Sequence, residues 1–120
     1  MNKWISISAL LGATAVIMGA FGAHGLQGKV EEKAIEWVRT GSHYQLTHAL
    51  ALLGWAIWRQ SQASASDLPG WGFTLGTVIF SGTLYAMTFG APRWFGAITP
   101  IGGTLLIAAW LTFAWQGFKA

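Results

Sequence analysis

Four long stretches of the 120-residue sequence contain no Asp, Glu, Lys or Arg, and this feature constrains the fold more than any other. A helix needs about 20 mostly apolar residues to cross the hydrocarbon core of a bilayer, because each residue adds about 1.5 Å. The four stretches are residues 4–26, 43–58, 71–89 and 100–118. The pattern predicts an all-α integral membrane four-helix bundle that forms a single transmembrane domain over residues 1–120.

Composition agrees with a chain whose main solvent is lipid. Hydrophobic residues make up 53% of the chain and charged residues only 9%, whereas about a quarter of the residues in typical globular domains are charged. The net charge of +3 comes from scattered residues, so no basic run predicts a nucleic-acid partner. The chain has no Cys, which excludes disulfides and thiolate metal sites.

The first two stretches are joined by a charged segment with an apolar face. Within residues 29–40, Val30, Ala34, Trp37 and Val38 fall on one side of a helix, and charged residues occupy the other side. We therefore expect a short amphipathic interfacial helix between helices 1 and 2. The alternative is a helical loop surrounded by water.

Four spans place both chain ends and the loop at 60–70 on one side of the membrane, with segments 29–40 and 91–99 on the other side. Lys and Arg occur in similar numbers on the two sides. The distribution of positive charge therefore leaves the orientation undecided.

Small residues form stripes on two of the predicted helices. Such stripes let helix backbones approach closely in lipid, where van der Waals contact holds helices together. The stripe on the first helix and the shorter one on the third comprise Gly12, Ala15, Gly19, Gly22 and Ala23, and Gly72 and Gly76. We interpret both as helix-packing surfaces, and the partner is either another helix of this chain or a second subunit.

The third predicted helix also carries hydroxyl groups spaced three or four residues apart, which places them on one face. They belong to Thr74, Thr77, Ser81, Tyr85 and Thr88. One interpretation is that these hydroxyls bond to carbonyls of their own and neighbouring helices. The other is that they line a path for a solute or protons, although no carboxylate for coupling lies in the span.

Intramembrane histidines are candidate functional residues because ionisable groups are costly in lipid. The first predicted span ends at residue 26 and the second begins at residue 43. The imidazoles of His24 and His48 are therefore expected at similar depth in the membrane. We expect a polar cluster near the membrane face opposite the chain ends, formed by His24, Tyr44, Gln45, His48, Arg93 and Thr99. A hydrogen-bonded network is the expected role, and a haem or metal site on His24 and His48 is the alternative. No motif for catalysis, a metal or another cofactor occurs, so we expect none of these.

Several segments closely resemble one family. They are Gly19-Ala-Phe-Gly-Ala-His-Gly-Leu26, Tyr44-Gln45 with His48-Ala-Leu-Ala-Leu-Leu53, Phe80-Ser-Gly-Thr-Leu-Tyr85, and Thr99-Pro-Ile-Gly-Gly103 ahead of Trp110. The family is that of bacterial membrane proteins with domain of unknown function 423, also called UPF0382, which has eukaryotic relatives such as transmembrane protein 256. The resemblance covers nearly the whole chain. It implies a four-helix bacterial inner-membrane protein, with no assigned reaction, substrate or cofactor.

These features predict a multi-pass protein of the bacterial inner membrane with a non-catalytic structural or interaction role. The expected partners are membrane lipids, together with further copies of the chain or a larger membrane complex. The alternative is a small-solute or ion transporter that acts as a dimer, since four short helices enclose little space on their own.

Overall fold

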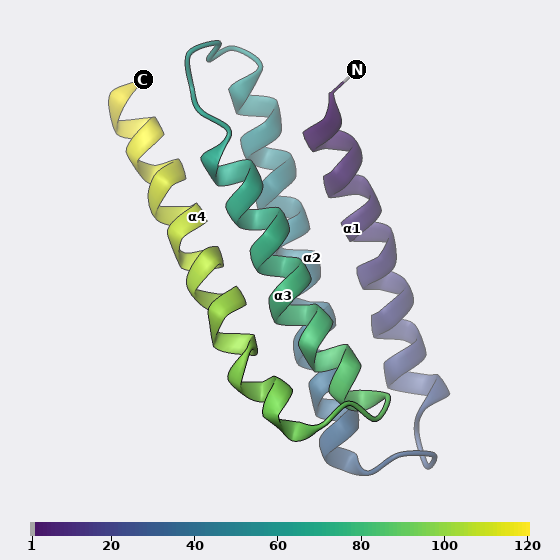
Figure 1. Ribbon diagram of the computed structural model, residues 1–120. Helices are drawn as coiled ribbons and strands as arrows, with labels where there is room; N and C mark the ends of the chain where they lie inside the picture. The colour runs from purple at the N-terminus through teal and green to yellow at the C-terminus, as the bar shows by residue number, and fades with distance from the viewer. Residues whose placement is uncertain (1) are drawn as a thin grey trace.

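The computed structural model describes residues 2–120, apart from the side chain of Ala23. Within this range the chain forms four long helices and no β-strand, as the sequence predicts (Figure 1). In chain order the elements are α1 (Lys3–Ala20), a π-helical turn η1 (Phe21–Gly25), α2 (Glu32–Arg59), α3 (Leu68–Thr88), a 3₁₀ segment η2 (Arg93–Ala97) and α4 (Thr99–Lys119).

Local sequence signals set the helix ends. The side chain of Asn2 caps α1 by accepting hydrogen bonds from the backbone N–H groups of Trp4 and Ile5, at 3.1 and 3.2 Å. A proline stands in the first turn of both α3 and α4, where its missing N–H costs nothing. Gly28 and Gly90 have φ angles of 77° and 109°, so they turn the chain after η1 and after α3.

The amphipathic segment is helical from Glu32, but it does not form a separate interfacial helix. It continues without a break into the second apolar stretch, and α2 has 28 residues. This length corresponds to about 42 Å, more than the roughly 30 Å hydrocarbon core of a bilayer. Gly41 lies within this helix, and the Tyr85 ring packs where a Cβ would stand, with Cε1 2.7 Å from that position. The charged first turns are therefore an extension of the second helix.

Consecutive helices carry the packing, with α1 on α2, α2 on α3 and α3 on α4. Both chain ends and the α2–α3 loop lie at one end of the bundle, which we call the terminal end (Figure 1). The η1 and η2 segments lie at the opposite end. The bundle measures 50 × 26 × 19 Å, so it is long and only about two helices thick.

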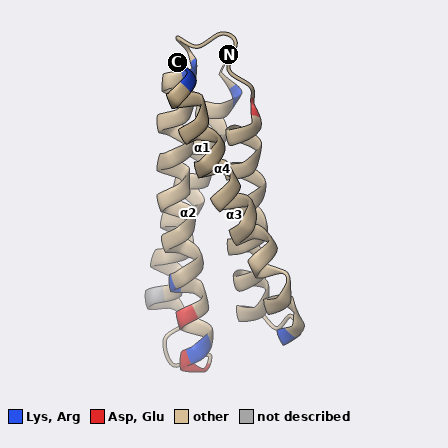
Figure 2. Ribbon diagram, turned by 90° about the vertical axis from the view of Figure 1, so that its left-hand side faces the viewer, with Lys and Arg blue, Asp and Glu red and all other residues tan. Residues whose placement is uncertain are grey.

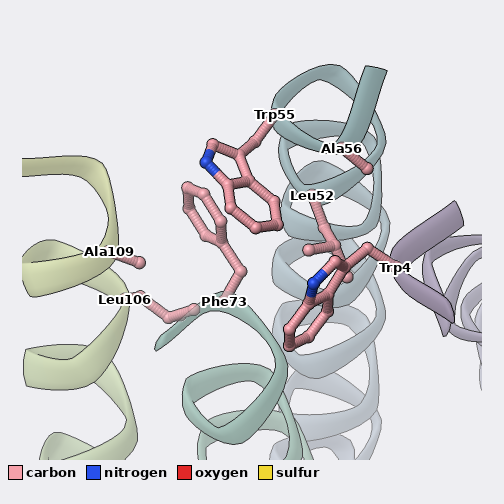
Figure 3. Packing of buried hydrophobic residues seen from close by; sticks show 7 residues of the cluster. All are labelled: Trp4, Leu52, Trp55, Ala56, Phe73, Leu106 and Ala109. Carbon is pink, nitrogen blue, oxygen red and sulfur yellow. The ribbon is translucent and has the colours of Figure 1, made fainter. Parts of the chain in front are cut away.

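All four helices contribute to one buried apolar cluster in the terminal half of the bundle (Figure 3). Its members are Trp4, Leu52, Trp55, Ala56, Phe73, Leu106 and Ala109. The Trp4 ring meets the rings of Trp55 and Trp71 edge to face, with centroids 5.6 and 5.2 Å apart. This cluster fixes the terminal ends of the helices relative to one another.

The outside of the bundle is apolar. Lys3–Ala20 and Arg93–Lys119 are long and apolar enough to cross a membrane, yet only 17% and 22% of the residues in an apolar 18-residue window of each are buried. A soluble protein would bury such helices in its core, because large exposed apolar patches are unfavourable in water. Charged residues gather at the two ends of the bundle and leave the middle free of charge (Figure 2). This distribution is typical of a membrane bundle.

Candidate functional site

Gln45 joins three helices. Its buried amide on α2 donates from Nε2 to the Leu11 carbonyl (2.9 Å) and to Thr14 Oγ1 (2.6 Å), both on α1. Its Oε1 accepts a hydrogen bond from the Tyr85 hydroxyl of α3 at 2.6 Å. A buried amide is stable only when its polar atoms have partners, and this one has partners on both sides. Gln45 therefore fixes α1 and α3 against α2.

The predicted hydroxyl stripe of α3 faces α2, and three of its members donate to that helix. The bonds run from Ser81 to the Gly41 carbonyl (2.7 Å), from Thr88 to the Ala34 carbonyl (3.1 Å), and from Tyr85 to the Gln45 side chain (2.6 Å). The bonded part of the stripe runs from Ser81 to Thr88, in the half of α3 that lies away from the terminal end. Its hydroxyls act as helix-to-helix contacts, which agrees with the first of the two interpretations.

The other two members of the stripe differ. The hydroxyl oxygens of Thr74 and Thr77 are buried and have no hydrogen-bond partner among the described residues. Thr77 lies one turn before Ser81, and its side chain is only 2% exposed. These hydroxyls occupy the face that meets α2 without contributing a bond to it.

His48 links α2 to α4. Its Nδ1 lies 2.7 Å from the Tyr44 carbonyl, and its Nε2 lies 3.1 Å from the indole Nε1 of Trp110. An indole N–H can only donate and a carbonyl can only accept, so the proton of the neutral ring is on Nδ1 and Nε2 is the acceptor. The Phe73 ring packs against the rings of His48 and Trp110, and its centroid lies 6.1 and 5.1 Å from theirs.

A groove of about 460 Å³ lies beside this pair, where α2 and α4 flank α3. We call it the α2–α4 groove. Its main lining residues are Tyr44 and His48 of α2, Phe80 of α3, and Gly103, Thr104, Ile107 and Trp110 of α4. Tyr44, Ile107 and Trp110 are exposed on the outside of the bundle. The groove therefore opens sideways, and its lining is mostly aromatic and aliphatic.

The structure does not bring His24 into a cluster with His48. Gly22 packs against Val38, because a Cβ at Gly22 would overlap the Val38 side chain. His48 follows Val38 by ten residues in α2, a rise of about 15 Å. His24 is exposed beyond Gly22, so the two imidazoles lie at different levels of the bundle. The sequence-based prediction erred because it began the second helix at His43, whereas α2 begins at Glu32.

The last two members of the predicted cluster make separate contacts. Thr99 Oγ1 lies 2.6 Å from Thr83 Oγ1 and joins the start of α4 to α3. The guanidinium of Arg93 is exposed and lies 3.4 Å from a carboxylate oxygen of Glu31. The structure thus divides the predicted cluster, with Tyr44 and His48 at the α2–α4 groove and Gln45 at the α1–α2–α3 contact.

The predicted small-residue stripe of α1 contacts α2 at two positions, and a third member is buried. Ala15 is buried, and Cβ atoms at Gly19 and Gly22 would meet Ser42 and Val38. A Cβ at Gly12 would meet nothing within 4 Å, so this residue is not part of the contact. Ala23, the fifth member, has its side chain outside the described part of the chain.

Glycines bring α3 and α4 together. A Cβ at Gly72 would stand 2.8 Å from the Ala109 Cβ, and one at Gly76 would stand 2.9 Å from the Leu106 side chain. The packing prediction missed Gly102, where a Cβ would overlap the backbone nitrogen of Phe80. The signal for it was the Gly102-Gly103 pair at the start of α4, one turn before the buried Leu106.

The described residues contain no group of three or more His, Asp or Glu side chains that could hold a metal ion. The alternative metal or haem site required His24 and His48 as joint ligands. Because His24 and His48 lie at different levels of the bundle, they cannot bind one metal ion or haem together.

Comparison with known proteins gives one consistent result. The profile of the family "Protein of unknown function (DUF423)" matches residues 18–103. A UPF0382 membrane protein of Haemophilus influenzae is 40% identical over 99% of this chain and 96% of its own length. YwdK of Bacillus subtilis, also called a UPF0382 membrane protein, is 37% identical over 92% of both chains.

The UPF0382 inner membrane protein YgdD of Escherichia coli is 38% identical over 86% of this chain and 79% of its own length. No solved structure matches the chain.

Proposed function

The chain belongs to the DUF423 family of membrane proteins, and from this premise we propose that it is a non-catalytic interaction protein of the bacterial inner membrane. All four helices cross the bilayer, and the protein acts by lateral contact with another transmembrane helix. The α2–α4 groove is the contact surface. A second copy of the chain is the partner with which this can be tested directly.

The observation that carries the proposal is that four of the polar side chains inside the bundle are used to join its helices. Gln45, Ser81, Tyr85 and Thr88 form hydrogen bonds between helices. Groups that hold helices together are not free to bind a substrate. Contact at the outer surface is then the role that the geometry supports best.

The α2–α4 groove suits a helix of a partner. It opens sideways at the level of His48, within the uncharged part of α2. Gly103 lines the groove and has no side chain to fill it. Small residues at the surface of a transmembrane helix allow close approach of another helix.

The transporter alternative rested on the hydroxyl stripe of α3. Three of the five hydroxyls donate to α2 in this arrangement. A transport path along the stripe would have to break these bonds. Proteoliposomes that show solute or proton flux, reduced by Ser81→Ala, would favour the transporter over the interaction protein.

A matched pair of single cysteines tests the contact, because the natural chain has none. Ile107 lines the groove, whereas Ala108 is its neighbour at nearly the same depth and lines a different hollow between α3 and α4. Under oxidation in native membranes, Ile107→Cys should give at least about tenfold more crosslinked dimer than Ala108→Cys, because consecutive residues point about 100° apart.

Equal crosslinking of the two variants would place the contact elsewhere. A monomeric protein in single-molecule photobleaching of the reconstituted natural chain would contradict self-association.

A further inference from the structure

A second hollow lies at the terminal end of the bundle, far from the α2–α4 groove. It has a volume of about 330 Å³ and lies between the start of α1, the end of α2 and the start of α3. Its charged lining residues are Lys3, Arg59 and Asp67, and the apolar ones are Trp4 and Ala56. Two cations against one carboxylate give this hollow a net positive charge.

Neighbouring side chains hold both cations in place. The ammonium of Lys3 lies 5.0 Å from the Trp4 ring centroid and 5.5 Å from that of Trp71. These are distances at which a cation is attracted to an aromatic face. No carboxylate of the described residues pairs with Lys3. Its charge is available to a ligand.

Arg59 is oriented by Asp67. Its Nε lies 2.9 Å from Asp67 Oδ1, and its guanidinium carbon lies 5.9 Å from the Trp55 ring centroid. The contact is an ion pair without hydrogen-bond geometry, and the terminal nitrogens of the guanidinium remain as donors for a ligand. The planar fork of an arginine matches two oxygens of one phosphate.

We propose that this hollow binds the phosphate group of an anionic phospholipid. The rings of Trp4, Trp55 and Trp71 lie beside the two cations, and tryptophans collect at the depth of lipid headgroups. Basic pockets between transmembrane helices bind such headgroups. Trp4 and Ala56, both buried members of the apolar cluster, form the apolar floor of the hollow. The site is independent of the α2–α4 groove, so its test does not depend on self-association.

Free phosphate carries the same charge chemistry, so the experiment separates the two sources. The purified full-length protein in neutral detergent is exposed to phosphatidylglycerol, phosphatidylcholine or inorganic phosphate, and bound adducts are counted by native mass spectrometry. Phosphatidylglycerol should bind in preference to phosphatidylcholine, and inorganic phosphate should neither bind measurably nor displace the lipid. Displacement of the lipid by inorganic phosphate would overturn the assignment to a lipid, as would equal binding of the two lipids.

Charge-neutral variants locate the site. Lys3→Gln and Arg59→Gln should each weaken phosphatidylglycerol binding about fivefold, the effect expected for one cation near an anionic lipid. Asp67→Asn should strengthen it, because it removes the only negative charge of the hollow. Lys119→Gln is the matched control: it removes a positive charge at the same end of the bundle, where Lys119 lines another hollow.

Loss of binding with Lys119→Gln equal to that with Lys3→Gln would show a diffuse surface effect and overturn the site. Arg59→Gln also removes a partner of Asp67 and could unfold the loop. The exposed Lys3 pairs with no carboxylate of the described residues, so Lys3→Gln decides the outcome even if Arg59→Gln cannot be purified.

Discussion

Helix α3 meets its two neighbours by opposite means. Toward α2 it presents hydroxyl groups, and Ser81, Tyr85 and Thr88 donate hydrogen bonds to that helix. Toward α4 it presents Gly72 and Gly76, and the two backbones come so close that a Cβ at Gly102 would overlap Phe80. Directed polar bonds distinguish the first interface, whereas the second is held mainly by close van der Waals contact, with one hydrogen bond between Thr83 and Thr99 at the start of α4.

The difference shows how a helix can be held by two neighbours in a lipid bilayer, where burial of apolar surface contributes little to helix association. Lipid chains are as apolar as leucine, so helices in a bilayer associate through packing and hydrogen bonds. Hydrogen bonds specify register, because each hydroxyl needs an acceptor at a defined level. Glycine contacts specify distance, because any side chain in the contact separates the backbones.

The largest effect is expected at the glycine interface. Gly102→Leu should lower the free energy of unfolding by about 3 kcal/mol, because backbone atoms of α3 already occupy the space that the new side chain needs. Unfolding with sodium dodecyl sulfate in mixed micelles measures this. Gly103→Ala is the adjacent control and should change the value little, since its Cβ would lie 3.7 Å from the Phe80 ring. Equal losses for both substitutions would contradict the close contact.

The polar interface should respond less strongly. Gln45→Leu removes hydrogen bonds to α1 and α3 and leaves the Tyr85 hydroxyl buried without its acceptor. We expect a loss of about 1–2 kcal/mol in the same unfolding assay. Combining it with Tyr85→Phe in a double-mutant cycle should give a coupling energy of about 1 kcal/mol. Strict additivity of the two substitutions would mean that the side chains do not interact.

A substitution within the stripe should act in the opposite direction. The Thr77 hydroxyl is buried without a partner among the described residues, and an unpaired polar group is costly to bury. Thr77→Val keeps the shape and removes that cost, so it should raise the free energy of unfolding by about 1 kcal/mol. A destabilised Thr77→Val protein would indicate that this hydroxyl does form a bond.

The smallest effect is expected for Ser81→Ala. It removes one hydrogen bond to the Gly41 carbonyl, and such bonds between transmembrane helices contribute about 0.6 kcal/mol on average. Thr77→Val is the matched comparison, because it deletes a hydroxyl one turn away on the same face. The two substitutions should shift stability in opposite directions, and shifts of the same sign would contradict the assigned roles.

The number and type of the helices could be predicted from the sequence because long uncharged stretches and cap residues are local signals. The extent of α2 could not, because a search for apolar stretches stops at the charged residues before His43 although helical backbone continues through them. That error shifted the expected position of α2 relative to α1 along the bundle, and it produced the false pairing of His24 with His48. It did not affect the stripe of α3, whose members share a face wherever the helix begins.

Two parts of the site depend on contacts between helices and had no local signal. The bond between His48 and Trp110 joins residues far apart in the sequence and on helices that are not consecutive. Gln45 was assigned to a cluster near one membrane face, whereas its partners on α1 are Leu11 and Thr14. Periodicity identifies the face of a helix, but the choice of neighbour for that face comes from the packing of all four helices.

We infer that the hydroxyl stripe of α3 holds helices together and does not line an aqueous path. Labelling of a single-cysteine variant, Ser81→Cys, with a membrane-impermeant thiol reagent tests this most directly, because position 81 lies midway along the stripe. In intact membranes we expect no labelling from either side, and complete labelling once the protein is denatured in detergent. Labelling of the folded protein in intact membranes would place water at the stripe and contradict the account.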